Sequence, residues 1–352
     1  MDPVSQAALG AVVGHVAGYR RLGHRAAVVG ALAGALPDVD VLFSAGGDYF
    51  DQLVAHRGIT HSLFFAPVAG PLLGALVWRL QRRSVAPPAG AGSWMLVVTL
   101  ALLSHPLLDY LTPYGTQLLL PFSQQRFAVN AMPIIDPVYT LVLLLGLAVA
   151  VTGSTARRRR SAPWVALGTL LVSCGYLGYG GYQNRIAEER AAAQLAASGV
   201  EEARVAAFPT ILQVHYRRVV ARTPDEDLVG FVSTWAPCPV VWTRAPRGER
   251  GPAVASFLAT REGRIFDWFT MGWARYRLEP APPGQRLQVT DLRYGFTTDP
   301  NRSIFSVSAV VDLAGEVIQP VRAGRAAADA TAERLALLFQ EAYAPACGAD
   351  VP

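Results

Sequence analysis

Residues 56–62 read His-Arg-Gly-Ile-Thr-His-Ser and stand directly before a long apolar run that begins at Leu63. Two imidazoles, a guanidinium and two hydroxyl groups therefore lie beside a segment that is apolar enough to enter a bilayer. Polar and ionisable side chains are costly in that setting and often mark a functional site. The stretch predicts a metal site at the outer face of a helical membrane bundle.

Charge is distributed unevenly along the 352 residues, which are 52% hydrophobic and 16% charged. Residues 1–184 hold 12 arginines and seven acids, all Asp, whereas residues 185–352 hold 19 arginines and 19 acids. The net charge of +5 thus belongs to the apolar first half. This division predicts a membrane domain at 1–184 and an extramembrane domain at 185–352. Arginines in loops between apolar runs are typical of membrane topology, so we expect no nucleic-acid partner.

Apolar runs in the first half predict a mainly α membrane bundle. Four runs approach the length of about 20 residues that a span requires: 62–80, 94–111, 134–151 and 163–182. Two shorter runs rich in Gly and Ala predict a helical hairpin lodged partly in the membrane: 7–20 and 25–36, the second ended by Pro37. The loops at 38–60 and 112–133 are polar and rich in turn residues.

Arginine placement predicts the orientation of this bundle. Ten of the 12 arginines in the first half fall in three clusters, at 20–25, 79–83 and 157–160. Cytoplasmic loops of membrane proteins are enriched in Arg and Lys. All three clusters lie in the cytoplasm if the two polar loops face outward. The last span then delivers residue 185 and everything after it to the extracytoplasmic side.

Short alternating runs in the second half predict a smaller α+β domain with an antiparallel sheet. The expected strands are 212–217, 229–235, 253–260, 266–276, 287–294 and 304–313. Helices are expected at 186–197 and 326–343. Cys174, Cys238 and Cys347 lack the spacing of a zinc ribbon or a disulfide framework. A bridge between Cys238 and Cys347 becomes possible if this half is exported.

Imidazole and carboxylate groups from distant segments are expected at one level of the bundle. His105 and Asp109 are four residues apart, which places both on one face of a helix. They lie near the outer end of their predicted span, and Asp38, Asp40 and residues 56–62 are expected at the same face. Nitrogen and oxygen ligands would therefore converge there.

The motifs Asp38-Val-Asp40, His56-Arg-Gly-Ile-Thr-His61-Ser and His105-Pro-Leu-Leu-Asp109 resemble those of the YdjM-type membrane-bound metal-dependent hydrolases of bacteria. The resemblance covers roughly residues 14–136. It implies a multi-pass protein of the bacterial inner membrane and a hydrolytic metal site. It implies no role for residues 185–352.

A more distant likeness is to the zinc-dependent phospholipases C and the single-strand-specific zinc nucleases. Carried over by position, it implies metal ligands at His15, Asp40 or Asp38, His61, His105 and Asp109. Those enzymes also use a processed N-terminal amine, of which Met1-Asp2 gives no sign. They use a later His and Glu for a third metal, and the first half here has no Glu and no His after His105. One or two metal ions are therefore implied.

Such a donor set suits zinc, with manganese or iron as alternatives. The metal would lower the pKa of a bound water to about 7 and hold it against an ester or phosphodiester, and by analogy a phospholipid. The residues expected to act in catalysis are Asp38, Asp40, His56 and Arg57. Arg57 would bind a phosphate oxygen, or would pair with Asp51 or Asp136. The residues expected to fix the imidazole tautomers are Thr60, Ser62 and Asp136.

Two other interpretations remain open. A non-catalytic membrane scaffold would use a structural metal or a His–Asp network to brace its helices. An ion-coupled transporter would also explain polar groups in a membrane, but such groups would line a path and would not gather at one face. His15 could equally be a packing residue, because Arg20 and Arg21 draw its helix toward the cytoplasm.

Overall fold

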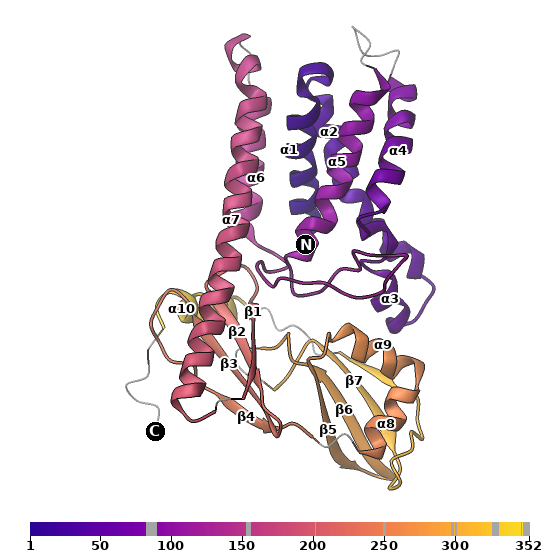
Figure 1. The fold of residues 1–352 in the computed structure, drawn as a ribbon, viewed down its shortest axis with the longest axis vertical. Helices are drawn as coiled ribbons and strands as arrows, with labels where there is room; N and C mark the ends of the chain where they lie inside the picture. Colours follow the sequence, from indigo (N-terminus) through magenta and orange to yellow (C-terminus); the bar gives the residue numbers. More distant parts are fainter. Residues whose placement is uncertain are drawn as a thin grey trace. The chain divides into compact units, whose positions relative to one another are not determined.

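The chain forms an all-helical unit and a unit built on two antiparallel sheets in a computed structural model (Figure 1). The first unit comprises Met1–Tyr179 with Ile211–Gln213, and the second comprises Gly180–Thr210 with Val214–Pro352. The structure describes residues 1–81, 90–152, 156–200, 202–248, 251–296, 299, 301–325, 331–345 and 347. The predicted fold class, a helical region followed by antiparallel sheet, is confirmed.

Glycines bring the first two helices into close contact. Helix α1 (Pro3–Leu22) and helix α2 (Arg25–Ala35) cross at Gly10 and Gly30, where a Cβ on either residue would overlap the carbonyl oxygen of the other. Small residues at such crossings let the backbones of membrane helices approach each other. The contact fixes the C-terminal end of α2, including Gly34, against α1.

Pro37 does not end the helical segment, contrary to the sequence-based expectation. Helix α2 passes into the 3-10 helix η1 (Leu36–Ser44), and Pro37 lies in the first turn of η1. Proline is tolerated there because its fixed φ suits a helix start and its missing N–H would have no partner. The polar loop predicted after it contains η1, helix α3 (Tyr49–Ala55) and the short 3-10 helix η2 (Ile59–His61).

Three described segments are long and apolar enough to cross a membrane: Arg25–Ser44, Ala91–Tyr110 and Arg160–Ala197. A fourth arises if Tyr49–His61 and Phe65–Gln81, which meet at a bend of 67°, count as one span. The first segment consists of α2 and η1, and the others contain α5 (Ala91–Tyr110), α7 (Ala156–Ala197) and, in the bent pair, α4 (Phe65–Gln81). Helix α6 (Pro137–Val151) is apolar but shorter. Arg82 and Arg83, which were used to predict the orientation, lie outside the described residues.

Helix α7 is a single helix of 42 residues, although the sequence predicted two helices separated near residue 183. Gln183 and Asn184 interrupt the apolar pattern, but both are buried. The Asn184 amide donates to the Glu188 carboxylate one turn later, which satisfies the polar group without breaking the helix.

In the second unit, the first sheet has the order β1-β2-β3-β4 and is antiparallel throughout. Its strands are β1 (Arg204–Pro209), β2 (Tyr216–Arg222), β3 (Glu226–Ser233) and β4 (Thr243–Pro246). Ala187 and Ala191 of α7 share a hydrophobic core with Val219 and Val232 of this sheet. The C-terminal part of α7 therefore covers one face of the sheet.

The second sheet has the order β5-β6-β7-β8, and two helices lie against it (Figure 1). The elements are α8 (Pro252–Ala259), α9 (Arg261–Phe269), β5 (Ala274–Ala281), β6 (Gly284–Asp291), β7 (Phe305–Val311) and β8 (Arg322–Arg325). The predicted strand at 253–260 is wrong, and so is the first part of the predicted strand at 266–276. Pro252 starts α8, and Thr260 caps α9 by accepting from the Gly263 N–H, so helix-start signals outweigh the strand propensity of the apolar residues.

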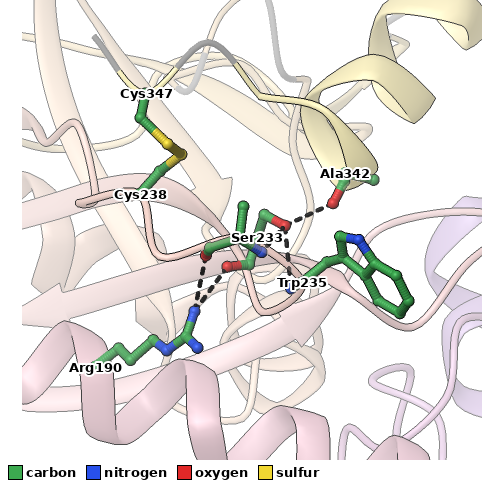
Figure 2. Close-up of a disulfide and its surroundings, with 7 residues drawn as sticks. Arg190, Ser233, Trp235, Cys238, Ala342 and Cys347 are labelled. Atoms are coloured by element: carbon green, nitrogen blue, oxygen red, sulfur yellow. Dashed lines mark hydrogen bonds between the residues drawn. A yellow bond between two sulfur atoms is a disulfide. The ribbon is translucent and has the colours of Figure 1, made fainter. Parts of the chain in front are cut away.

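The chain closes on helix α10 (Ala332–Tyr343) and a disulfide between Cys238 and Cys347 (Figure 2). The Ser233 hydroxyl donates to the Ala342 carbonyl at 2.5 Å, which holds the end of α10 beside β3. The disulfide links the segment after β3 to the segment after α10. The predicted helix at 326–343 agrees with α10 over its described part, and residues 326–330 lie outside that part.

Candidate metal centre

Four side chains from three segments meet in the helical unit. They are Asp38 of η1, His61 of η2, and His105 and Asp109 of α5. One potential ligand atom from each lies within 4.8 Å of the other three. His61, His105 and Asp109 are fully buried, and the Asp38 side chain is 22% exposed. This buried group could hold a metal ion.

The distances within the group match a small tetrahedral site. The Nε2 atoms of His61 and His105 are 2.9 Å apart. Oδ2 of Asp109 lies 3.3 Å from the first and 3.6 Å from the second, and Oδ1 of Asp38 lies 3.6 Å and 3.3 Å from them. Zinc bonds of about 2.0–2.2 Å would place tetrahedral ligand atoms about 3.3–3.6 Å apart. Four of the five distances fall in this range and the distance between the Nε2 atoms is shorter, so the donor set could hold one small metal ion.

Hydrogen bonds fix both imidazoles in the tautomer that a metal requires. Nδ1 of His105 lies 2.6 Å from the Gly34 carbonyl oxygen, which only accepts, so Nδ1 carries the proton and Nε2 presents its lone pair. Nδ1 of His61 lies 3.1 Å from Oδ2 of Asp40, so Nδ1 carries a proton and, in the neutral ring, Nε2 presents its lone pair. Carbonyl and carboxylate partners of this kind orient metal-binding histidines.

Sequence comparison places the chain in a family. The model of the YdjM inner membrane protein family matches residues 1–187, which is more than half of the chain and includes every residue of the centre. The chain belongs to the YdjM family. The inner membrane protein YbcI of Escherichia coli (strain K12) is 36% identical over 126 residues, which cover 35% of this chain and 69% of YbcI. No solved structure matches the chain.

The predicted resemblance to the YdjM family is thus confirmed, and the family match describes an inner membrane protein. It ends within α7, so most of the sheet unit lies beyond the matched residues.

In this YdjM-family chain, Arg57 is part of the interior of the centre. Its backbone is left-handed, with a φ of 59°, and its N–H donates to Oδ2 of Asp40 at 2.8 Å. Its guanidinium lies 3.0 Å from Oδ2 of Asp109 and donates to the Thr112 hydroxyl at 2.7 Å. The guanidinium also stacks on Tyr114, 4.7 Å from the ring centre. Arg57 therefore neutralises and positions Asp109.

The two alternative partners predicted for Arg57 are engaged elsewhere. Asp51 completes the capping box of α3 with Asp48. Asp136 caps α6 by accepting from the Tyr139 N–H, and it also accepts from the Tyr176 hydroxyl. Carboxylates at helix starts satisfy N–H groups that have no partner within the helix, which explains both positions.

Two contacts to Asp109 were missed from the sequence. The Gln6 amide donates to Oδ1 at 2.9 Å, and the α-amino group of Met1 contacts the same oxygen. Asp2 caps α1 and donates its N–H to the Ile134 carbonyl, which holds the first residues against the bundle. A Gln that directly precedes a run of small apolar residues was the sequence signal for the first contact. For the second contact, the sequence offered only the more distant likeness to zinc enzymes that use an N-terminal amine.

Asp40 lies behind His61 and not among the four converging atoms. Its Oδ1 is 3.1 Å from Nδ1 of His56, while Oδ2 contacts His61, Arg57 and the Thr60 hydroxyl. The position that the likeness assigned to Asp40 or Asp38 is therefore filled by Asp38. His56 is the most accessible histidine beside the centre, with 29% of its side chain exposed.

Three predicted residues are not brought to the cluster. His15 stacks on Tyr19 with ring centres 4.5 Å apart. The start of α1 lies beside Asp109, and His15 is twelve residues further along this helix, a distance of about 18 Å. The Ser62 hydroxyl donates to the Leu118 and Leu120 carbonyls and so anchors the loop after α5. Asp136 serves α6, as described above. Of the residues expected to fix tautomers, Thr60 contacts His61, at 3.1 Å from Nδ1.

Proposed function

We propose that this YdjM-family protein is a membrane-bound metal-dependent hydrolase that cleaves an ester or phosphodiester in an amphiphilic substrate. The observation that carries the proposal is the convergence of four electron-rich atoms whose lone pairs are fixed by their partners. Such atoms repel one another in a buried site unless a cation lies among them. Arg57 offsets the charge of Asp109, and a proton on one Nε2 would be the competing arrangement, whereas a divalent ion engages all four atoms at once.

We infer that the ion is zinc. Two imidazoles and two carboxylates at tetrahedral spacing favour Zn²⁺ over Mg²⁺ or Ca²⁺, which prefer more oxygen ligands. To act on a substrate, zinc held by these four residues would have to accept a water as a further ligand, and it would lower the pKa of that water to about 7. Among the described residues a single such group is found, so one ion is proposed.

The residues around the centre would transfer protons and position the ligands. Asp40 receives the Nδ1 proton of His56, which leaves Nε2 of this partly exposed histidine able to exchange a proton with a reacting group. Asp40 also orients His61, so one carboxylate serves both imidazoles. Arg57 holds Asp109 in place and is a positioning residue, because its guanidinium is buried against that carboxylate.

Metal removal tests the proposal. Purified wild-type protein is expected to contain one equivalent of zinc and to hydrolyse bis(p-nitrophenyl) phosphate and a phosphatidylcholine. A chelator should abolish both activities, and one equivalent of zinc should restore them. His56→Ala should keep the metal and lose most of the activity, by about 10²–10⁴-fold.

One observation favours a second candidate, the scaffold with a structural metal. Asp109 is already surrounded by Arg57, Gln6 and the Met1 amine, so the centre is closed on that side. For a scaffold, chelation would lower thermal stability, neither substrate would be cleaved, and His56→Ala would change nothing. A protein that neither contains nor takes up metal would contradict both proposals.

We further propose that the metal centre and the sheet unit lie on the extracytoplasmic side. The disulfide supports this for the sheet unit, since disulfides persist in oxidising compartments and are rare in the cytosol, and the arginine clusters of the first half support it for the metal centre. In a Cys174→Ser background, intact cells should yield a protein whose two remaining thiols react with a maleimide only after reduction. Free thiols in untreated cells would place the unit in the cytoplasm. The Cys238→Ser variant, with one free thiol, is the labelling control.

A further inference from the structure

An apolar groove lies between η1 and α4, next to the metal centre. Its volume is about 340 Å³, within the range of roughly 300–1,000 Å³ of small-molecule sites. The lining includes Val39 and Phe43 of η1, Thr60 of η2, and Phe65, Ala69 and Leu72 of α4. Within this lining the Thr60 hydroxyl is the polar group, and it already contacts His61. The remaining surface is hydrocarbon.

The groove begins at the wall of the centre. Val39 stands in the chain between Asp38, which joins the four converging atoms, and Asp40, which orients His61. Thr60 immediately precedes His61. Two lining residues are therefore each adjacent in sequence to a candidate metal ligand, and the Thr60 hydroxyl brings this end of the groove within hydrogen-bond distance of Nδ1 of His61.

From the centre the groove follows α4. Phe65, Ala69, Leu72 and Leu73 recur at helical spacing on one face, and eight residues of α-helix cover about 12 Å. Phe43 and Leu72 are each 69% exposed, so the groove is open along one side. Helix α4 belongs to a candidate span of an inner membrane family, so an open apolar side of this helix faces lipid hydrocarbon.

We propose that this groove holds one hydrocarbon chain of a lipid substrate, with the scissile ester or phosphodiester at the metal centre. The inference rests on the proposed hydrolase function and narrows its substrate class to a membrane lipid. A chain that moves from the bilayer into the groove exchanges one apolar environment for another. The groove therefore orients the substrate. Its contribution is to the rate of hydrolysis, because it places the scissile bond beside the metal.

Substitutions that fill the groove are expected to slow hydrolysis of a lipid and not of a small soluble substrate. Ala69→Phe and Leu72→Trp should lower hydrolysis of a long-chain phosphatidylcholine by about 10- to 100-fold, because the bond is misplaced. Zinc content and hydrolysis of bis(p-nitrophenyl) phosphate should not change. Val68→Trp is the matched control, because Val68 is exposed on the same helix and is not among the lining residues. Equal effects on both substrates, or none on the lipid, would overturn the inference.

A second measurement does not depend on activity. A phosphatidylcholine with a diazirine in one acyl chain, incorporated into nanodiscs, should cross-link to η1 and α4 at the lining residues. Ala69→Phe should remove these cross-links and spare those at Val68. Labelling that is the same in the wild type and in Ala69→Phe would overturn the inference. If the wild type cleaves neither substrate, groove-specific labelling still supports chain binding while the hydrolase proposal fails.

Discussion

Asp109→Asn is expected to empty the metal centre and to destabilise the helical unit. The substitution replaces a charged ligand oxygen with a neutral amide, so zinc affinity should fall by more than the factor of about 10–100 that loss of a ligand's supporting partner costs. It also removes the counter-charge of the buried Arg57 guanidinium, 3.0 Å away. Breaking a buried ion pair in this way costs about 3–5 kcal/mol. Metal analysis and thermal unfolding measure the two effects.

Asp38→Asn separates these two consequences. The Asp38 side chain is partly exposed, and it pairs with His61 and His105 rather than with an arginine. It should therefore lose zinc with a much smaller change in unfolding temperature. Asp225→Asn, at an exposed position in the sheet unit, should change neither. If Asp109→Asn retains its metal, Asp109 is not a ligand; if it is as stable as the wild type, the ion pair with Arg57 does not stabilise the unit.

The pattern that revealed the centre was local in sequence. His105 and Asp109 lie one helical turn apart, so the spacing alone placed them on one face of α5. His61 was identified because a histidine beside an apolar run is costly there. These positions follow from helix geometry and from hydrophobicity, which a sequence carries directly.

The choice between Asp38 and Asp40 could not be made in that way. Both lie on η1, a 3-10 helix with about three residues per turn, so two residues apart they point in different directions. The sequence predicted a polar loop there and gave no helical phase. The direction of each carboxylate depends on where η2 packs, which is a long-range contact.

The Gly34 carbonyl illustrates a further limit. It fixes the tautomer of His105, yet a backbone carbonyl has no signature in the sequence. The same holds for the Met1 amine at Asp109. In the sheet unit, α8 and α9 were mistaken for strands because short apolar runs fit both structures, and the helix-start residues Pro252 and Thr260 decided between them.

Gly30→Val is expected to disrupt the metal centre without touching it. The added Cβ would overlap the Gly10 carbonyl oxygen of α1, and the branched side chain has no room to turn away. Helix α2 must then move outward, at a cost of about 1–3 kcal/mol or more. Gly34, one turn further along α2, moves with it and withdraws its carbonyl from Nδ1 of His105.

The loss of that hydrogen bond frees the tautomer of His105, so zinc affinity should fall by about 10–100-fold, measured by competition with a fluorescent chelator. Gly168→Val is the matched control, because a Cβ at Gly168 of α7 meets no atom within 4 Å. It should leave affinity and stability near wild type. Unchanged zinc affinity in a destabilised Gly30→Val protein would mean that the His105 tautomer does not depend on α2. Loss of both stability and zinc affinity would show that the glycine contact between α1 and α2 controls the tautomer of His105.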